Sequence, residues 1–364
     1  MKIIFIVNAL HMQRCVKRID EFAERGYEVE AYGFDRGVAV KNKPQSCQIH
    51  VIGKIDSSAS YFRRIGVIAK GIRSVLNATK KTPSVYYLFG LDNVMFFRLQ
   101  SNLPYIYEES DLVHTYMKSK IAVSFFERID ISSIKKSLLS VFTSEGFVDY
   151  HFGANVPDNT IVVPNRLPPT VGKCATLPSK CFDGNRLSIG FVGFIRFNSV
   201  YNFAKTFCEF FPNYEFHFYG VANVESDRKM FEPLKEYKNC IFHGPFNYPN
   251  DLPAIYSNID LVVATYDTEF LNVIYAEPNK IYESIYFDTP IIVSSGTFLA
   301  KKVKRLGIGY EIDANNSNAV CSFIKGINEK DLNEKVSCIR KIDKKDTMNI
   351  NNHLFDKLAQ LGIV

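Results

Sequence analysis

The chain has 364 residues, of which 46% are hydrophobic and 14% aromatic, so it can bury two packed domains, and global disorder is excluded. The formal net charge of +6 comes from residues 1–170, which hold 22 lysines and arginines against 16 acidic residues, while the remainder holds 22 against 22. This asymmetry indicates an anionic partner for the first half, either nucleic acid, a membrane surface or a lipid-linked phosphate.

The eight cysteines are scattered along the chain and do not cluster with histidines, which predicts reduced thiols. The apolar start at 1–7 is too short for a signal sequence, and no apolar run approaches the roughly 20 residues that span a bilayer. We therefore expect a cytoplasmic protein.

Short apolar runs alternate with helical patterns in the first half, as expected of a parallel sheet covered by helices. We predict a helix at 13–25 and strands at 3–7, 28–32, 49–52, 85–88, 105–108, 139–143 and 160–163. The segment 61–81 carries six cations and no acid, with apolar residues at helical spacing. It either lies on an anionic bilayer or covers its own sheet and turns a basic face to solvent.

Polar side chains follow two of these strands. Glu108, Glu109 and Asp111 stand at the end of the strand at 105–108 and either bind a hydroxylated acceptor or cap the next helix. Asn8 and His11 follow the first strand and leave the same two alternatives open.

The segment 164–185, rich in Pro, Gly, Lys and Ser, is predicted to be an interdomain linker. The second half repeats the α/β pattern, with strands expected at 187–192, 215–219, 240–242, 261–264 and 291–294. The predicted fold class is α/β, with two Rossmann-like domains and a ligand in the cleft between them, at the carboxyl ends of the strands.

Two strand ends in the second half carry candidate binding residues. Gly193 and Arg196 follow a buried strand, where an anion could bind, although taken alone they are more often a turn glycine and a solvated arginine. The turn at His243 and Gly244 either places backbone groups against a nucleobase or is an ordinary connection.

The segment 277–283 reads Glu-Pro-Asn-Lys-Ile-Tyr-Glu, and its proline suits the first turn of a helix. Lys280 and Glu283 are three residues apart and share a helical face. The lysine and the N-terminal amides suit a diphosphate and the carboxylate suits ribose hydroxyls; the alternative is a surface ion pair.

Dinucleotide and phosphate-loop glycine motifs are missing from the sequence, which disfavours dehydrogenases and phosphate-loop ATPases. An Asp-x-Asp motif is missing as well, so we expect no metal and no cofactor at the site. Charge on a leaving diphosphate would then be met by Arg196, Lys280 and helix amides.

In chain order these motifs resemble the GT-B glycosyltransferases, and within them glycosyltransferase family 4. The resemblance rests on the acidic strand end, 162–165, 190–193 with Arg196, the strand at 260–263, and above all 278–283 with 289–294. It implies an acceptor-side domain at 1–170, a donor domain at 185–344, and a helix at about 345–364 that returns to the first domain. It also implies retaining, metal-independent hexosyl transfer, in which the leaving phosphate helps to take the acceptor proton.

The resemblance assigns roles to residues of this chain. The expected donor-binding residues are Gly193, Arg196, His243, Gly244, Glu277, Asn279, Lys280, Ile281 and Glu283, the last at the ribose. The expected catalytic residues are Arg196, Lys280 and Asp111, and the acceptor-side residues are Asn8, His11, Glu109 and Asp111.

Three positions depart from the family pattern: Tyr275 replaces a glutamate, Tyr201 replaces a lysine, and Ser110 with Asp111 stands for a His-Asp pair. The leading hypothesis is a glycosyltransferase of capsule or exopolysaccharide synthesis, peripheral on the inner face of the membrane. Its expected partners are a nucleotide-sugar donor, a glycan or polyprenyl-linked acceptor and an anionic membrane surface at 61–81, and not nucleic acid. A non-catalytic nucleotide-sugar binding subunit and a nucleotide-sugar epimerase remain alternatives.

Overall fold

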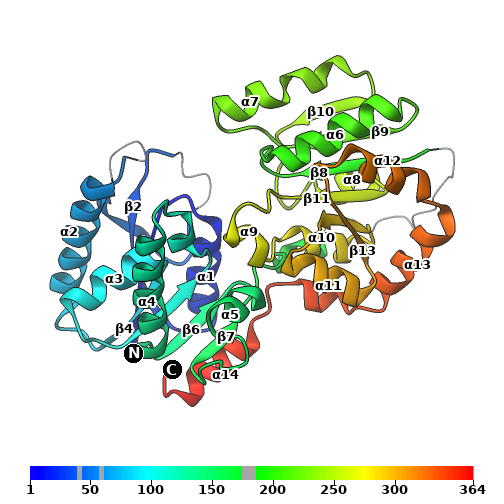
Figure 1. The fold of residues 1–364 in the computed structure, drawn as a ribbon. Helices are drawn as coiled ribbons and strands as arrows, with labels where there is room; N and C mark the ends of the chain where they lie inside the picture. Colours follow the sequence, from blue (N-terminus) through cyan, green and yellow to red (C-terminus); the bar gives the residue numbers. More distant parts are fainter. Residues whose placement is uncertain (39–42, 57–60, 174–185, 364) are drawn as a thin grey trace. The chain divides into compact units, whose positions relative to one another are not determined.

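The structure, a computed structural model, describes residues 1–38, 43–56, 61–173 and 186–363. The chain divides into one unit made of Met1–Pro164 with Asn351–Val364 and another made of Asn165–Ile350 (Figure 1). The boundary precedes the expected residue 170 because Leu167 is fully buried in the second unit, where it bridges to Met348. The part of the expected linker at 174–185 lies outside the described residues.

The first unit is built on a seven-stranded parallel sheet with the order β3-β2-β1-β4-β5-β6-β7. Its strands are β1 (Lys2–Val7), β2 (Glu28–Asp35), β3 (Ile49–Lys54), β4 (Ser84–Phe89), β5 (Tyr105–Glu109), β6 (Leu139–Phe142) and β7 (Thr160–Val162). Its helices are α1 (Gln13–Glu24), α2 (Tyr61–Thr79), α3 (Leu91–Gln100), η1 (Val113–Tyr116), α4 (Lys120–Lys136), α5 (Glu145–Phe152) and α14 (Asn352–Gln360). Every strand expected in this half is present; the inner strands are buried apolar runs bounded by turn residues, whereas the edge strands β3 and β7 contain no buried residue.

Helix α2 contains most of the basic segment. Ile68, Ile72 and Val75 are buried at helical spacing, and the helix packs on β3 and α3. Arg63 and Lys70 are exposed on the outer face. The helix therefore covers its own sheet, which is the second alternative, and its basic face remains open to solvent.

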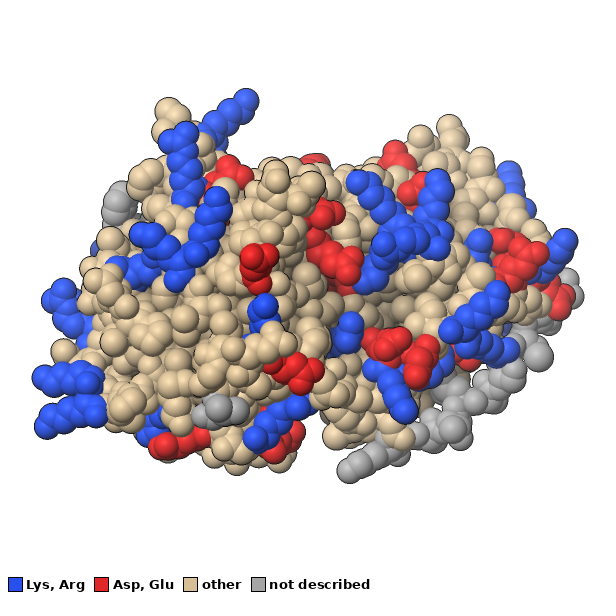
Figure 2. Space-filling view, turned by 90° about the horizontal axis from the view of Figure 1, so that it is seen from below, with Lys and Arg blue, Asp and Glu red and all other residues tan. Residues whose placement is uncertain are grey.

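Charges of both signs occur on the surface: Figure 2 shows lysine and arginine side chains interspersed with acidic ones on the face drawn. Among the described residues, no helix has the length and apolar character that crossing a bilayer requires.

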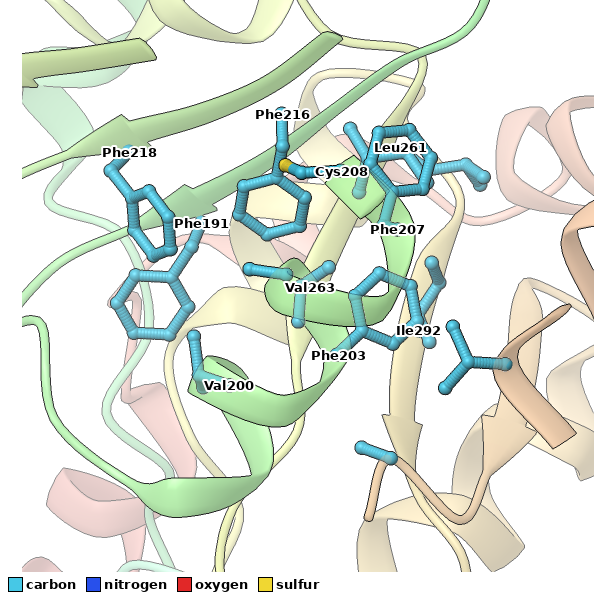
Figure 3. Close-up of a cluster of buried hydrophobic side chains, with 14 of the residues drawn as sticks. Phe191, Val200, Phe203, Phe207, Cys208, Phe216, Phe218, Leu261, Val263 and Ile292 are labelled. Atoms are coloured by element: carbon cyan, nitrogen blue, oxygen red, sulfur yellow. The ribbon is translucent and has the colours of Figure 1, made fainter. Parts of the chain in front are cut away.

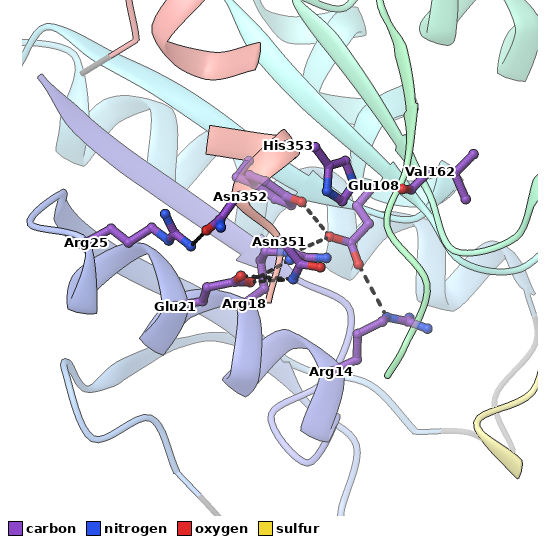
Figure 4. A network of polar contacts seen from close by, with 10 residues as sticks. Arg14, Arg18, Glu21, Arg25, Glu108, Val162, Asn351, Asn352 and His353 are labelled. Atoms are coloured by element: carbon purple, nitrogen blue, oxygen red, sulfur yellow. Dashed lines mark hydrogen bonds and ion pairs between the residues drawn. The ribbon is translucent and has the colours of Figure 1, made fainter. Parts of the chain in front are cut away.

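A buried polar network attaches the C-terminal segment to α1 (Figure 4). Arg18 Nε donates to Glu108 Oε2 at 3.1 Å, and Arg18 Nη1 donates to Glu21 Oε2 at 2.6 Å. Asn351 Nδ2 donates to Glu21 Oε1 at 2.8 Å, so the network runs from β5 through α1 to the start of α14. Burial opposes the charge of Arg18, but the nearby Glu108 and Glu21 outweigh it and raise the arginine pKa.

Helix α14 also contributes apolar side chains to the first unit. Leu354, Phe355 and Leu358 belong to its core, and Figure 1 shows the helix beside β7. The return starts at Asn351, later than the expected 345, because Lys344 is held in the second unit by Asp288.

The second unit contains a six-stranded parallel sheet with the order β10-β9-β8-β11-β12-β13. Its strands are β8 (Ser188–Val192), β9 (Glu215–Tyr219), β10 (Cys240–Gly244), β11 (Leu261–Ala264), β12 (Ile291–Ser294) and β13 (Gly309–Ile312). Its helices are η2 (Pro169–Lys173), α6 (Asn198–Phe210), α7 (Glu225–Phe231), η3 (Glu232–Glu236), α8 (Leu252–Ser257), α9 (Leu271–Tyr275), α10 (Lys280–Tyr286), α11 (Phe298–Leu306), α12 (Ser317–Gly326), α13 (Glu329–Arg340) and η4 (Lys344–Thr347).

Side chains of this sheet alternate between two cores, one on each face. Leu261 and Val263 point into the core formed with α6, drawn in Figure 3, whereas Val262 and Ala264 point into the core formed with α8, α10 and α11. This period of two explains why β11 reads as a continuous apolar run in the sequence. The residues of the candidate site follow the carboxyl ends of these strands.

Candidate functional site

In each sheet the order in which successive strands are added reverses at one place. This switch lies between β1 and β4 in the first unit and between β8 and β11 in the second. Open α/β sheets bind ligands outside the carboxyl ends of the strands at such a switch point. In the second unit these ends are Gly193, directly after β8, and the Thr265–Tyr266 pair after β11.

Lys280 lies at this switch point. Its Nζ is 3.1 Å from the position that a β-carbon on Gly193 would occupy, and it donates to Tyr266 Oη at 3.3 Å. Its ammonium also stands 4.7 Å from the centre of the Phe191 ring. The lysine therefore presents a half-buried positive charge between the ends of β8 and β11.

Glycines allow the backbone to approach closely here. Gly193 has φ +132°, a conformation that residues with a side chain rarely adopt. A β-carbon on Gly220, after β9, would lie 1.8 Å from the Gly193 carbonyl oxygen, so only glycine fits there. The sequence analysis identified Gly193 and overlooked Gly220.

Glu283 is on α10, one turn after Lys280, and is 6% exposed. Its Oε2 accepts a hydrogen bond of 2.7 Å from Tyr256 Oη, and burial together with the Glu283 charge raises the pKa of Tyr256. The tyrosine thus stays protonated and fixes one carboxylate oxygen. The bonds found for the two side chains go to different tyrosines, Lys280 to Tyr266 and Glu283 to Tyr256.

Arg196 is exposed, and its guanidinium carbon lies 4.7 Å from the centre of the Phe197 ring. That ring packs edge-on against Tyr266 at 4.9 Å, and Tyr266 accepts the hydrogen bond from Lys280. Arg196 and Lys280 are thus joined through two aromatic rings at the same end of the sheet.

Other members of the expected donor set are engaged internally. Glu277 is buried, with Oε2 2.7 Å from Lys302 Nζ and the Tyr282 hydroxyl donating to Oε1. Ile281 is fully buried in the core. These two positions hold α10 in place, so direct contact of their side chains with a ligand is not supported.

Asn279 is the residue before α10, and its side chain makes no capping hydrogen bond. Its carbonyl oxygen accepts from the amides of Tyr282 and Glu283, and the Ile281 amide donates to the Pro278 carbonyl. The expectation that all the N-terminal amides of this helix face a diphosphate is therefore wrong for these three.

His243 and Gly244 end β10. The His243 ring stacks on Tyr219 at 4.1 Å, and its Nε2 is 3.0 Å from His217 Nδ1. Burial lowers the pKa of His243. The exposed His243 ring, stacked on the buried Tyr219 at a strand end, suits a planar ligand, which leaves the nucleobase interpretation open.

In the first unit, the switch point brings together two residues expected on the acceptor side. The Asn8 carbonyl oxygen accepts from Arg36 Nε at 2.9 Å, and Asn8 Oδ1 accepts from Asn93 Nδ2 at 2.6 Å. Burial and the charge of Arg36 lower the pKa of His11, so its imidazole is neutral near pH 7. Arg36, the first residue after β2, was overlooked although its place at a strand end is readable in the sequence.

The acidic strand end separates into two environments. Asp111 is exposed beyond β5, whereas Glu109 is only 1% exposed and its Oε1 lies 2.9 Å from His151 Nε2. Burial and the Asp130 charge raise the pKa of Glu109 to about 8. The role of Asp111 stays a prediction, and direct acceptor contact by Glu109 is not supported.

One of the departures from the family pattern, Tyr201, has a structural explanation. Tyr201 packs edge-on against Phe231 in the α6 core, so it does not replace a cation at the strand ends.

The side chain of Asp267 accepts hydrogen bonds from the amides of Asn198 and Ser199 and so caps α6. That helix N-terminus is filled by the protein itself.

No family model matches the chain, and no curated protein matches it either. Solved structures do match over almost its full length. Sucrose-phosphate synthase from Thermosynechococcus elongatus superposes with a TM-score of 0.72 at 12% identity, covering 99% of both chains. HepE from Anabaena, solved in complex with UDP and glucose, gives 0.71 at 13% identity and also covers 99% of both.

An enzyme of another class matches as well. A putative UDP-N-acetylglucosamine 2-epimerase from Listeria monocytogenes gives a TM-score of 0.60 at 10% identity, covering 100% of this chain and 97% of that one. At these identities the similarity shows the fold. With two Rossmann-like units on parallel sheets of seven and six strands, the chain has the GT-B fold.

Proposed function

We propose that the protein is a glycosyltransferase that binds a nucleotide-sugar at the β8–β11 switch point of its second unit. The observation that carries the proposal is the placement of Lys280 and Glu283 on one turn of α10. The first is held beside Gly193, and the second accepts a hydrogen bond from Tyr256.

The charges at this site suit the donor. An ammonium at the end of β8 offsets the negative charge of a diphosphate, and Arg196 supplies a second cation at the same strand ends. The Glu283 carboxylate accepts hydrogen bonds from ribose hydroxyls. HepE, a structure with the same fold, was solved with UDP-glucose, which supports a nucleotide-sugar as the ligand class.

The finer mechanism is part of the proposal. Two side-chain cations and the missing Asp-x-Asp motif favour a metal-independent transfer, in which the departing phosphate accepts the acceptor proton and the anomeric configuration is retained. Asp111, Asn8 and His11 in the first unit would bind a hydroxylated acceptor, either a glycan or a polyprenyl-linked sugar.

The basic face of α2 would hold the protein at an anionic membrane where such acceptors reside. Co-sedimentation with anionic liposomes over a salt series tests this part, because electrostatic attachment weakens as salt rises. A protein that stays in the supernatant at every salt concentration would remove it.

The donor assignment is tested by thermal shift against UDP-, GDP- and CMP-sugars, since a ligand of the folded state raises the apparent stability. One donor should stabilise the wild type and fail to stabilise Glu283→Gln. The matched control is Glu236→Gln, an exposed acid of the same unit, which should respond like the wild type.

An epimerase is the second candidate, favoured by the fold similarity to the putative 2-epimerase. Incubating the selected donor alone and following the sugar by NMR separates the two. An epimerised sugar would support the second candidate, whereas transfer to an added acceptor supports the first. Binding without either reaction would indicate a non-catalytic binding subunit.

A further inference from the structure

A buried cluster in the first unit gathers titratable side chains that the donor site does not use. Glu109 ends β5, Asp130 lies in α4, His151 lies in α5 and His114 lies in η1. The glutamate, the aspartate and His114 are at most 1% exposed, and the His151 side chain is fully buried. Four elements that are separate in the sequence therefore direct ionisable groups into one volume.

The ligand atoms of three side chains in this cluster lie close together. One ligand atom each from Glu109, Asp130 and His151 lie within 4.8 Å of one another. His151 Nε2 is 2.9 Å from Glu109 Oε1, and His114 Nδ1 is 3.3 Å from Asp130 Oδ2. Two atoms bound tetrahedrally to the same zinc ion are about 3.3 Å apart, because each bond is about 2.0–2.1 Å long.

Among the residues that the structure describes, several polar atoms of the cluster find no hydrogen-bond partner. They are Glu109 Oε2, Asp130 Oδ2, His151 Nδ1 and both ring nitrogens of His114. Buried polar atoms are rarely left unpaired, and where they are, an ion or a water is a common cause. Two buried carboxylates, each with one oxygen that lacks a hydrogen bond, also carry a desolvation cost, which a divalent cation would offset.

We propose that Glu109, Asp130 and His151 bind a divalent first-row transition metal such as zinc. Two carboxylates and a neutral imidazole around a divalent ion have no net charge, which suits a buried site. The mixture of imidazole and carboxylate ligands favours zinc and its first-row neighbours over magnesium or calcium, which prefer oxygen ligands alone.

Tyr107 supplies the outer contact that such sites require. Its hydroxyl donates to Asp130 Oδ1 at 2.8 Å, which leaves Oδ2 as the oxygen directed to the metal. Outer contacts of this kind orient the ligating carboxylate, and their loss weakens metal affinity by about 10- to 100-fold. The metal would join β5, α4 and α5 beneath Asp111, within one unit.

The experiment starts from the full-length chain, with any affinity tag removed, purified without chelator. Elemental mass spectrometry should find about one transition-metal ion per chain, because structural metals are carried through folding. A chelator should lower the Tm, and zinc, but not magnesium, should restore it. Replacement by cobalt(II) should give the visible absorption of a tetrahedral centre.

Tyr107→Phe provides a variant that is expected to fold. It removes the hydroxyl that orients Asp130, so the Kd for zinc, measured by competition with a chromophoric chelator, should rise about 10- to 100-fold. Tyr105→Phe is the matched control: it lies on the same strand, and its buried hydroxyl donates to the Ser133 carbonyl oxygen at 2.8 Å, away from the cluster. Its zinc affinity should equal that of the wild type.

Asp130→Asn and His151→Asn should lose the metal. A wild-type protein with substoichiometric metal and a Tm that does not respond to zinc would overturn the proposal. Equal zinc affinity in Tyr107→Phe and Tyr105→Phe would overturn it too. In either case the cluster would be a set of acid–imidazole hydrogen bonds.

Discussion

The ammonium of Lys280 occupies the space above Gly193: Nζ lies 3.1 Å from where a β-carbon on that glycine would be. The lysine comes from α10 and the glycine ends β8, so the contact joins two elements at the point where the sheet reverses its progression. Because Gly193 has no side chain, the positive charge stays next to the strand end, where a ligand phosphate could reach it.

Lys280→Met keeps most of the side-chain length and removes the charge. We predict that affinity for the nucleoside diphosphate of the selected donor falls about 10- to 100-fold, since a hydrogen bond to a charged group contributes about 1.5–3 kcal/mol. Affinity for the corresponding nucleoside, which has no phosphate, should not change. Isothermal titration measures both, and Lys205→Met, an exposed lysine on α6, serves as control. Equal losses for the nucleoside and its diphosphate would contradict the diphosphate role.

Gly193→Ala should weaken donor binding while the lysine is still present. An alanine at φ +132° is strained, and its methyl group would push the Lys280 ammonium away. Gly326→Ala is a control in the same unit, because a β-carbon there meets nothing within 4 Å. Thermal shift with the donor compares the two variants; an unchanged donor response in Gly193→Ala would show that the position of the ammonium does not matter.

The His217 and His243 pair predicts a pH dependence of stability. Burial lowers the pKa of both, and for His217 the charges of His243 and Arg186 add to this while Glu215 opposes it. The unfolded imidazoles titrate near 6.5, so below that pH the unfolded state binds more protons than the folded state. The stabilisation is complete above about pH 6.5 and is lost as the pH falls through and below it.

Urea denaturation between pH 5 and 8 measures this slope. His243→Gln should have a shallower acid loss than the wild type because it removes one of the two groups. An identical slope in the variant would show that the pair does not contribute.

The buried network of Arg18 predicts a large loss of stability. Arg18→Met leaves Glu108 fully buried without its closest cation and should cost about 3–5 kcal/mol, as expected when one partner of a buried pair is removed. Lys235→Met breaks an exposed pair with Glu232 and should cost less than about 1 kcal/mol. Urea midpoints compare the two, and similar midpoints would contradict the assigned role of the network.

The predicted GT-B fold is confirmed, and the reason can be followed in particular elements. Strands such as β8 and β11 are continuous buried runs, which a sequence displays directly. Strand β13 (Gly309–Ile312) was not predicted, because only its last residue is buried. Gly309 is needed there for another reason: a β-carbon would lie 2.0 Å from the Ile291 carbonyl oxygen of the neighbouring strand.

The site was predictable where its residues are close in sequence. Lys280 and Glu283 are one helical turn apart, so their common face follows from helix geometry. Tyr256 and Tyr266, which hold them, come from α8 and the end of β11, and sequence spacing does not indicate such pairings. The same holds for Glu109 and His151, which are separated by 42 positions and meet only in the folded unit.

The central claim is that Lys280 and Glu283 bind one nucleoside diphosphate, the first at the phosphates and the second at the ribose. Isothermal titration of the wild type, Lys280→Met and Glu283→Gln with the nucleoside diphosphate and with the nucleoside tests it most directly. We predict saturable binding by the wild type, loss of affinity for both ligands in Glu283→Gln, and loss for the diphosphate alone in Lys280→Met. A wild type that binds no nucleotide of the UDP, GDP and CMP series, or a Glu283→Gln variant with unchanged affinities, would contradict the claim.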